Sequence, residues 1–164
     1  MVLTARVATA YRESVRWLEF ASPVADLAVR LWVAHVFWQA GLTKIQSMYS
    51  TIGLFTYVYH VPLLPPEVAA YLGTGVELIL PVLLAFGLAG RLSAGILFVY
   101  NIVAVISYPG LGADGVQLHI MWGIMLLVTF LHGPGTLSLD CLLARLFRRW
   151  RDRGPQADGA TAVR

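Results

Sequence analysis

Four long apolar stretches constrain the fold of this chain more than any other feature. A helix of about 20 apolar residues crosses the hydrocarbon core of a bilayer, where every backbone polar group must be paired within the chain. The composition is also typical of a membrane protein, because 58% of the residues are hydrophobic and only 13% are charged. An ordinary soluble domain has a smaller apolar share and a larger charged share. We therefore predict an all-α polytopic membrane protein with a four-transmembrane-helix bundle over residues 22–137. The predicted spans are about 24–45, 66–88, 92–108 and 116–132.

The segment before the bundle, residues 1–21, mixes charged and apolar side chains. This pattern favours an amphipathic helix at the cytoplasmic membrane surface, although a solvated basic tail would have the same composition. Ser22 and Pro23 then supply an N-cap and a proline at the first helical position, which are two signals for a helix start. We expect the first spanning helix to begin there.

The segment after the bundle, residues 138–153, is also amphipathic. Its arginines and its large apolar residues fall on opposite faces of a helix. We predict a basic interfacial helix on anionic lipid, capped at its N-terminus by Ser138 or Asp140. Residues 154–164 are rich in Gly, Pro and Ala and are predicted to form a disordered tail.

The distribution of basic residues predicts the orientation of the bundle. Nearly all arginines lie in the N-terminal segment, at the turn around Arg91 and in the C-terminal helix, while the 46–65 and 107–115 connections hold no Lys or Arg. Cytoplasmic segments carry such an excess of basic residues, so we predict that both termini are cytoplasmic. The net charge of +3 is then a topological signal and does not indicate nucleic-acid binding. The first connection, rich in aromatic residues, is predicted to form a short interfacial helix or lid.

Glu77 places an ionisable carboxyl in the second apolar stretch. A charge at that depth is costly, which makes it a candidate for function and requires a partner. Pro81 lies four residues later and has no N–H to donate to the Glu77 carbonyl, so one turn offers an acid and a free carbonyl. Small residues on the same stripe predict that this face looks into the bundle. Arg30 is the predicted partner, either in a pair that holds two helices in register or in a ligand or proton-relay site.

Other polar side chains in the spans are further candidates. Lys44, at the end of the first span, is predicted to snorkel to its interface. His35 and Gln39 fall on roughly the opposite face from Arg30. Asn101 is predicted to hydrogen-bond across helices, with substrate contact as the alternative. The ligand or proton-relay candidates are Glu77, Arg30, His35, Gln39, Asn101 and His119.

Bound metal and haem are not predicted. The histidines are scattered, without a close cluster of His, Cys or carboxylate ligands. His35 falls near the middle of the membrane, whereas His119 and His132 fall near opposite surfaces, so no two of them match in depth as axial haem ligands would. The single cysteine, Cys141, excludes an internal disulfide or a CxxC pair. Electron chemistry would therefore depend on a cofactor or a partner.

Five short motifs follow one another along the chain. They are Val-Arg-Leu at 29–31, Gln-Ala-Gly-Leu-Thr-Lys at 39–44, Gly-Val-Glu at 75–77, Phe-Gly-Leu-Ala-Gly-Arg at 86–91 and Gly-Pro-Gly-Thr-Leu-Ser-Leu-Asp at 133–140. Their order and spacing resemble the DoxX family of small four-helix bacterial membrane proteins, over about residues 24–146. The candidate structural or motif residues of the chain are Lys44, Pro81, Arg91, Ser138 and Asp140.

The resemblance implies a multi-pass protein of the bacterial inner membrane. Members of the family are linked to thiosulfate:quinone oxidoreductase, as a membrane subunit, and to oxidative-stress complexes. The chain would then be a non-catalytic or quinone-facing subunit with a soluble or membrane redox partner, and quinone is the cofactor it would meet. One alternative is a small-solute or ion carrier that acts as a homo-oligomer, because a proline-broken helix beside an acid suits an ion site. Another is a structural anchor or assembly factor for a soluble partner.

Overall fold

The computed structural model describes residues 2–152, and this part of the chain is entirely helical. Four of its helices contain stretches that are long and apolar enough to cross a membrane, namely Val15–Ile45 within the first helix and the whole of the third, fourth and fifth. The prediction of an all-α bundle with four spans is confirmed. The helices are α1 (Val2–Ile45), α2 (Met48–Tyr57), α3 (Pro66–Phe86), α4 (Gly90–Ser107), α5 (Ala113–His132) and α6 (Leu139–Asp152).

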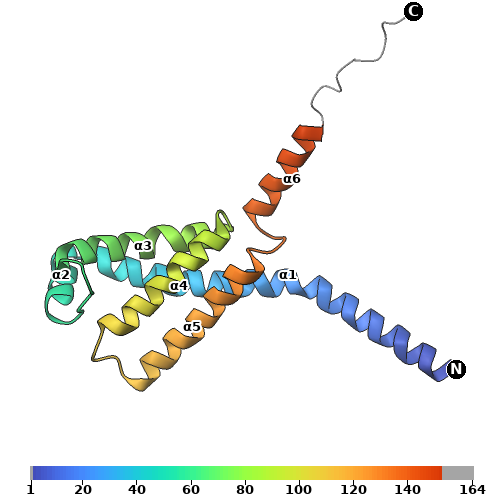
Figure 1. Cartoon of the computed structure of the whole chain (residues 1–164), viewed down its shortest axis with the longest axis horizontal. Coiled ribbons are helices and arrows are strands. Elements are labelled where there is room, and N and C mark those ends of the chain that lie inside the picture. The colour runs from blue at the N-terminus through green and yellow to red at the C-terminus, as the bar shows by residue number, and fades with distance from the viewer. Residues whose placement is uncertain (1, 153–164) are drawn as a thin grey trace, which may run out of the picture.

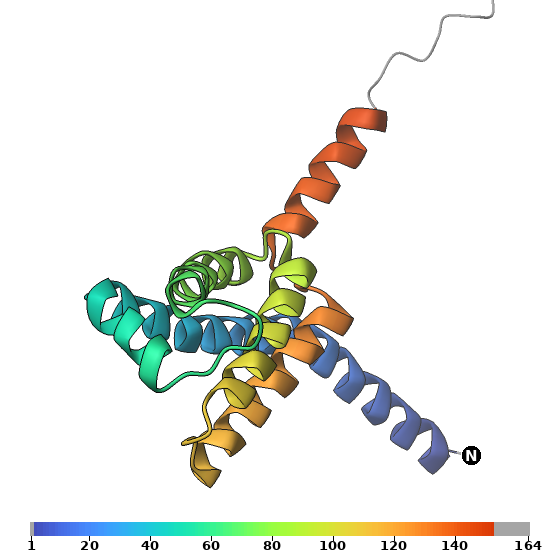
Figure 2. The same ribbon diagram turned by 60° about the vertical axis from the view of Figure 1, so that its left-hand side comes forward.

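The bundle is built from two close helix pairs, α1 with α3 and α4 with α5, and further contacts join α3 to α4 and α1 to α5 (Figures 1 and 2). Helices α1 and α3 approach closely at Gly41, where an added Cβ would lie 3.0 Å from the backbone carbonyl carbon of Glu77. Small residues permit such close backbone contact inside a membrane. The core is formed by Val33, Ala34, Phe37, Leu84, Ala94, Leu97 and Leu126.

The first helix does not begin at Ser22 and Pro23, as the sequence predicts, but continues through both as part of α1. A proline in a helix removes one backbone hydrogen bond and does not have to end the helix. Pro23 lies in the N-terminal half of α1, which extends away from the bundle (Figure 1). Residues 2–21 are therefore helical but not a separate element, and their position on the membrane surface stays a prediction.

The 46–65 connection contains the expected short helix, α2, capped by the Ser47 side chain. The chain after it lies across one end of the bundle (Figure 2). There the backbone N–H of His60 donates to the carbonyl of Ser107 over 2.7 Å. The Tyr59 ring packs edge-on against Phe55 and Tyr108. This connection thus covers the bundle end mainly through aromatic contacts.

The opposite end of the bundle is held by polar contacts of the α5–α6 connection and the start of α6. The Asp140 carboxylate accepts hydrogen bonds from the backbone N–H groups of Ala89 and Gly90, at 2.9 and 2.8 Å. Asp140 therefore satisfies the N-terminus of α4, while Ser138 caps α6 by accepting from the N–H of Cys141 at 3.2 Å. Of the two predicted caps of the last helix, Ser138 is the one that acts there.

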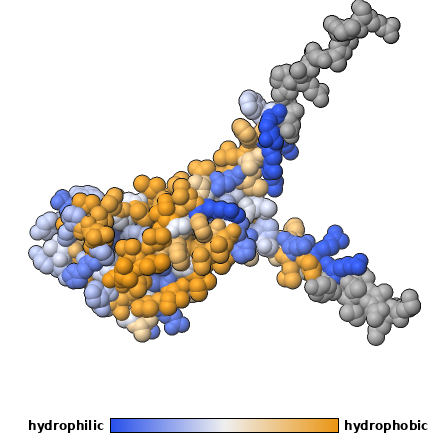
Figure 3. Space-filling view, in the orientation of Figure 1, coloured by the Kyte–Doolittle hydropathy of each residue, from blue (hydrophilic) through white to orange (hydrophobic). Residues whose placement is uncertain are grey.

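The last helix, α6, and the N-terminal part of α1 leave the bundle from the same end (Figure 1). The apolar and arginine residues of α6 are exposed, and Figure 3 shows basic and apolar atoms along this helix beside the apolar surface of the bundle. The amphipathic character is confirmed, and its contact with anionic lipid stays a prediction. The predicted tail at 154–164 lies outside the described residues.

Single-cysteine labelling tests the predicted orientation, with Cys141→Ser as the background. A Gly112→Cys side chain would meet no atom within 4 Å, and Arg148→Cys lies on the exposed surface of α6. We expect a membrane-impermeant maleimide to label Gly112→Cys in intact cells and Arg148→Cys only after the membrane is opened, because basic segments stay in the cytoplasm. The reverse pattern would show that the termini face outward.

Candidate functional site

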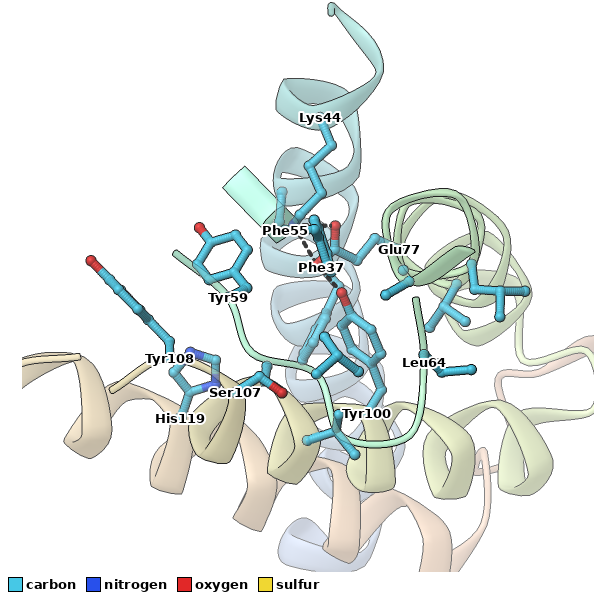
Figure 4. A pocket seen from close by; sticks show the side chains of 18 of the residues that line it. Phe37, Lys44, Phe55, Tyr59, Leu64, Glu77, Tyr100, Ser107, Tyr108 and His119 are labelled. Atoms are coloured by element: carbon cyan, nitrogen blue, oxygen red, sulfur yellow. Dashed lines mark hydrogen bonds and ion pairs between the residues drawn. The ribbon is translucent and has the colours of Figure 1, made fainter. Parts of the chain in front are cut away.

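A cavity with a volume of about 430 Å³ lies inside the bundle, lined by residues from α1 to α5 and from the connections after α2 and α4. Most of its wall is apolar or aromatic, and the side chains that converge on it are drawn in Figure 4. Cavities of this size and composition, with a few polar groups, are typical of small-molecule sites. The aromatic members of the wall are Phe37, Phe55, Tyr59, Tyr100, Tyr108 and Trp122.

The polar centre of the cavity is an ion pair between Lys44 and Glu77. The Lys44 ammonium donates to both carboxylate oxygens, at 2.7 and 2.6 Å, and the side chains are 18% and 6% exposed. The Tyr100 hydroxyl donates to Glu77 Oε1 at 2.8 Å. Three helices, α1, α3 and α4, thus meet at one carboxylate whose charge is balanced by an ammonium (Figure 4).

Arg30 is not the partner of Glu77, contrary to the sequence-based expectation. Its buried guanidinium donates to the carbonyls of Pro134 and Leu137, the second at 2.7 Å. The physical reason is the register of α1 on α3: Glu77 packs at the level of Gly41, which is roughly 16 Å along the helix from Arg30 but one turn from Lys44. The Lys44 side chain accordingly does not snorkel to the membrane interface, as the sequence predicts, but forms an ion pair with Glu77 inside the bundle.

Two other predicted candidates on α1, His35 and Gln39, are exposed on the outer surface of the bundle. Pro81 is buried, but it borders a shallow groove with His35 and does not line the Glu77 cavity. The acid and the proline of α3 therefore face different spaces. A ligand site made by the Glu77 carboxylate and the carbonyl freed by Pro81 stays a prediction.

Asn101 and His119 link α4 to α5, as predicted for Asn101. The Asn101 amide nitrogen donates to the His119 carbonyl at 2.9 Å, and 2.8 Å separates Asn101 Oδ1 from His119 Nδ1. The His119 ring also packs against Trp122, with ring centroids 4.9 Å apart. Both rings line the cavity, so this candidate histidine reaches the same space as Glu77.

Sequence reasoning did not single out two polar groups of the cavity, Tyr100 and Ser107. Tyr100 could have been found, because a phenol in an apolar span needs a hydrogen-bond partner. Ser107 is 3% exposed, and its hydroxyl has no hydrogen-bond partner among the described residues. A buried hydroxyl without a partner is costly, so Ser107 marks a point at which the cavity offers an unmet hydrogen bond.

Tyr59, in the connection over the cavity, has a perturbed hydroxyl. Burial raises the pKa of Tyr59, and the neighbouring Tyr108 and the Glu77 carboxylate raise it further. A phenol of ordinary pKa is already neutral at physiological pH, and the upward shift of the Tyr59 pKa moves its ionisation further from that range. The ring is then available for its aromatic contacts without adding a second negative charge near Glu77.

Within residues 2–152, no group of three or more His, Cys, Asp or Glu side chains is placed to hold a metal ion. Acidic residues are sparse inside the bundle, and Glu77 has Lys44 as its counter-ion. The cavity presents hydrogen-bonding groups and an aromatic wall.

Comparison with known proteins agrees with this architecture. The DoxX family model matches residues 25–109, about half of the chain. The chain belongs to the DoxX family. A second family model, described as TQO small subunit DoxD, matches residues 70–154 of this DoxX protein. An uncharacterized protein of Haemophilus influenzae is 31% identical over 137 residues, which cover 77% of the DoxX chain and 87% of that relative. No solved structure matches the chain.

Replacement of Arg30 is expected to destabilise this DoxX protein strongly. Arg30→Met leaves two loop carbonyls without their donor, and we expect it to lower the free energy of unfolding by about 3 kcal/mol. Arg91→Met is the control, since Arg91 is exposed and reaches the carbonyls of Leu131 and His132 at 3.4 Å, and about 1 kcal/mol or less should be lost. Denaturant unfolding followed by circular dichroism measures both. If both variants lose the same free energy of unfolding, the hydrogen bonds of Arg30 do not stabilise the α5–α6 connection more than those of Arg91 do.

The Lys44–Glu77 pair should show strong coupling in a double-mutant cycle. Lys44→Met leaves a buried carboxylate without its counter-ion and should cost about 3 kcal/mol. In a Glu77→Gln background the same change removes an ammonium that no longer has a carboxylate, so the double variant should lose at least about 1 kcal/mol less than the sum of the single losses. Unfolding of the four proteins in one detergent gives the coupling energy. If the losses of the two single variants add up to the loss of the double variant, Lys44 and Glu77 are solvated and do not interact strongly.

Proposed function

We propose that this protein is a quinone-facing membrane subunit of a redox complex and that it binds a quinone head group in the cavity around Glu77. The observation that carries the proposal is an apolar, aromatic cavity with one charge-balanced polar cluster and one buried hydroxyl without a partner. The matches to the DoxX model and to the model described as TQO small subunit DoxD support the redox setting.

The hydrogen-bonding groups of the cavity fit such a head group. A quinone presents a flat apolar ring with two carbonyl oxygens, which need donors. The Lys44 ammonium carries three N–H bonds, and the carboxylate of Glu77 is its bonded partner, so it retains donor capacity. The Ser107 hydroxyl is a second donor without a partner. The aromatic wall is suited to the ring, and a space of about 430 Å³ lies within the range of small-molecule sites.

The roles of the polar residues follow from their contacts. Glu77 balances the charge of Lys44, so the ammonium can stay in an apolar wall. Tyr100 holds one oxygen of that carboxylate and fixes its orientation. A bound quinone would supply the capacity to take up electrons and protons. The protein residues would hold the head group and orient it.

The proposed location is the bacterial inner membrane, with both termini cytoplasmic. The cavity then lies in the outer half of the bilayer, because α2 and the chain after it, which line the cavity, lie at the bundle end opposite α6 and the N-terminal part of α1 (Figure 1). A lipid-soluble ligand could reach it from the membrane, and an electron-transfer partner would dock on the protein. No oligomeric state is implied by this arrangement.

Quinone titration tests the proposal. Decylubiquinone is added to the protein in lipid nanodiscs, and tryptophan fluorescence is followed, since Trp122 lines the cavity. We expect saturable quenching that Trp122→Phe removes in large part. Lys44→Met should weaken binding about tenfold, because a hydrogen bond from a charged donor is worth roughly 1.5–3 kcal/mol.

The matched control is His35→Phe, a substitution on the outer surface of α1 away from the cavity, which should leave the dissociation constant unchanged. The absence of saturable binding in the wild-type protein would contradict the proposal. Ion-dependent flux in liposomes without quinone binding would favour a carrier instead.

A further inference from the structure

The contacts of Asn101 determine which nitrogen of His119 carries hydrogen. The Asn101 amide nitrogen faces the His119 backbone carbonyl at 2.9 Å. A carbonyl oxygen can only accept a hydrogen bond, so the atom that faces it must be the NH₂ group of the amide. The orientation of the amide is thereby assigned from its hydrogen bonds. The atom that faces the His119 ring is then Asn101 Oδ1.

This orientation fixes the tautomer of the neutral imidazole. Asn101 Oδ1 lies 2.8 Å from His119 Nδ1, and an amide oxygen can only accept. Nδ1 must therefore carry the hydrogen. A neutral imidazole has one N–H, so Nε2 is bare and acts as an acceptor. Asn101 has no charge with which to stabilise a second proton on the ring.

The ring that carries the bare nitrogen lines the cavity. Nε2 of His119 has no hydrogen-bond partner in the part of the chain that the structure describes. Ser107 lines the same cavity with a buried hydroxyl that also lacks a partner. The α4–α5 wall thus presents an acceptor and a hydroxyl, apart from the Lys44–Glu77 pair (Figure 4).

We propose that His119 Nε2 accepts a hydrogen bond from a ligand hydroxyl, so that the cavity binds the reduced quinol form of the head group more tightly than the oxidised quinone. This inference rests on the proposed function. A quinone carbonyl opposite Nε2 would place two acceptors face to face, whereas a quinol hydroxyl supplies the hydrogen that Nε2 lacks. Ser107 can donate or accept and therefore does not discriminate. Asn101 is a positioning residue, because it holds the ring in the tautomer that accepts.

Paired titrations under anaerobic conditions test the preference. Decylubiquinol and decylubiquinone are titrated into the nanodisc-embedded protein with the same fluorescence readout. The wild-type protein should bind the quinol about tenfold more tightly, the effect of one hydrogen bond gained and one repulsion avoided. His119→Phe should abolish this ratio mainly by weakening quinol binding. His35→Phe, on the outer surface of α1, should keep the wild-type ratio.

The tautomer itself has a readout that needs no ligand. Nitrogen NMR of protein labelled at histidine distinguishes Nδ1–H from Nε2–H, and His119→Phe identifies the His119 signals. We expect Nδ1–H for His119 in the wild-type protein and a mixture of tautomers in Asn101→Leu, together with a smaller quinol preference. A wild-type signal from Nε2–H would overturn the inference, whatever the variants do.

The binding data separate this inference from the proposed function. Equal affinity for quinol and quinone in the wild-type protein, or an equal loss of both in His119→Phe, would overturn the preference and leave quinone binding in place. Failure of both forms to bind would overturn the two proposals together.

Discussion

The structure depends on one buried ion pair, Lys44 with Glu77. A lone charge inside an apolar bundle is costly, and the pair makes that cost tolerable because the ammonium contacts both carboxylate oxygens. The pair fixes the register of α1 on α3 together with the close approach at Gly41. The hydroxyl of Tyr100 adds α4 to the same centre. The polar end of the cavity is therefore a consequence of how the bundle is held together.

The two ends of the bundle are stabilised by different interactions. At the end from which both α6 and the N-terminal part of α1 leave, the Arg30 side chain binds backbone carbonyls of the α5–α6 connection. The Asp140 carboxylate binds backbone N–H groups at the start of α4. At the other end, aromatic contacts and one backbone hydrogen bond, from His60 to Ser107, hold the chain over the cavity. The cavity thus lies beneath the end that is covered mainly by aromatic contacts.

Several features could be predicted because they depend on local sequence. The four spans follow from the length of their apolar runs, the cap of α6 from Ser138, and the interhelical role of Asn101 from an amide in an apolar run. The start of α1 was predicted wrongly at Pro23, because a proline also occurs inside continuous helices. The family resemblance, confirmed by the DoxX match, added the expected topology and redox setting but not the contacts of individual side chains.

By itself, the sequence determined that this is a four-span helical membrane protein with an acid facing the bundle interior, since apolar length and helical periodicity are local properties. Only the tertiary structure decided that Glu77 pairs with Lys44, that Arg30 binds loop carbonyls, and that Tyr100 and Ser107 face the same cavity. The physical reason is register. Side chains far apart in the chain meet at a depth set by the axial position of one helix against another, and Arg30 and Lys44 are about four turns apart on α1, so only one of them lies at the depth of Glu77.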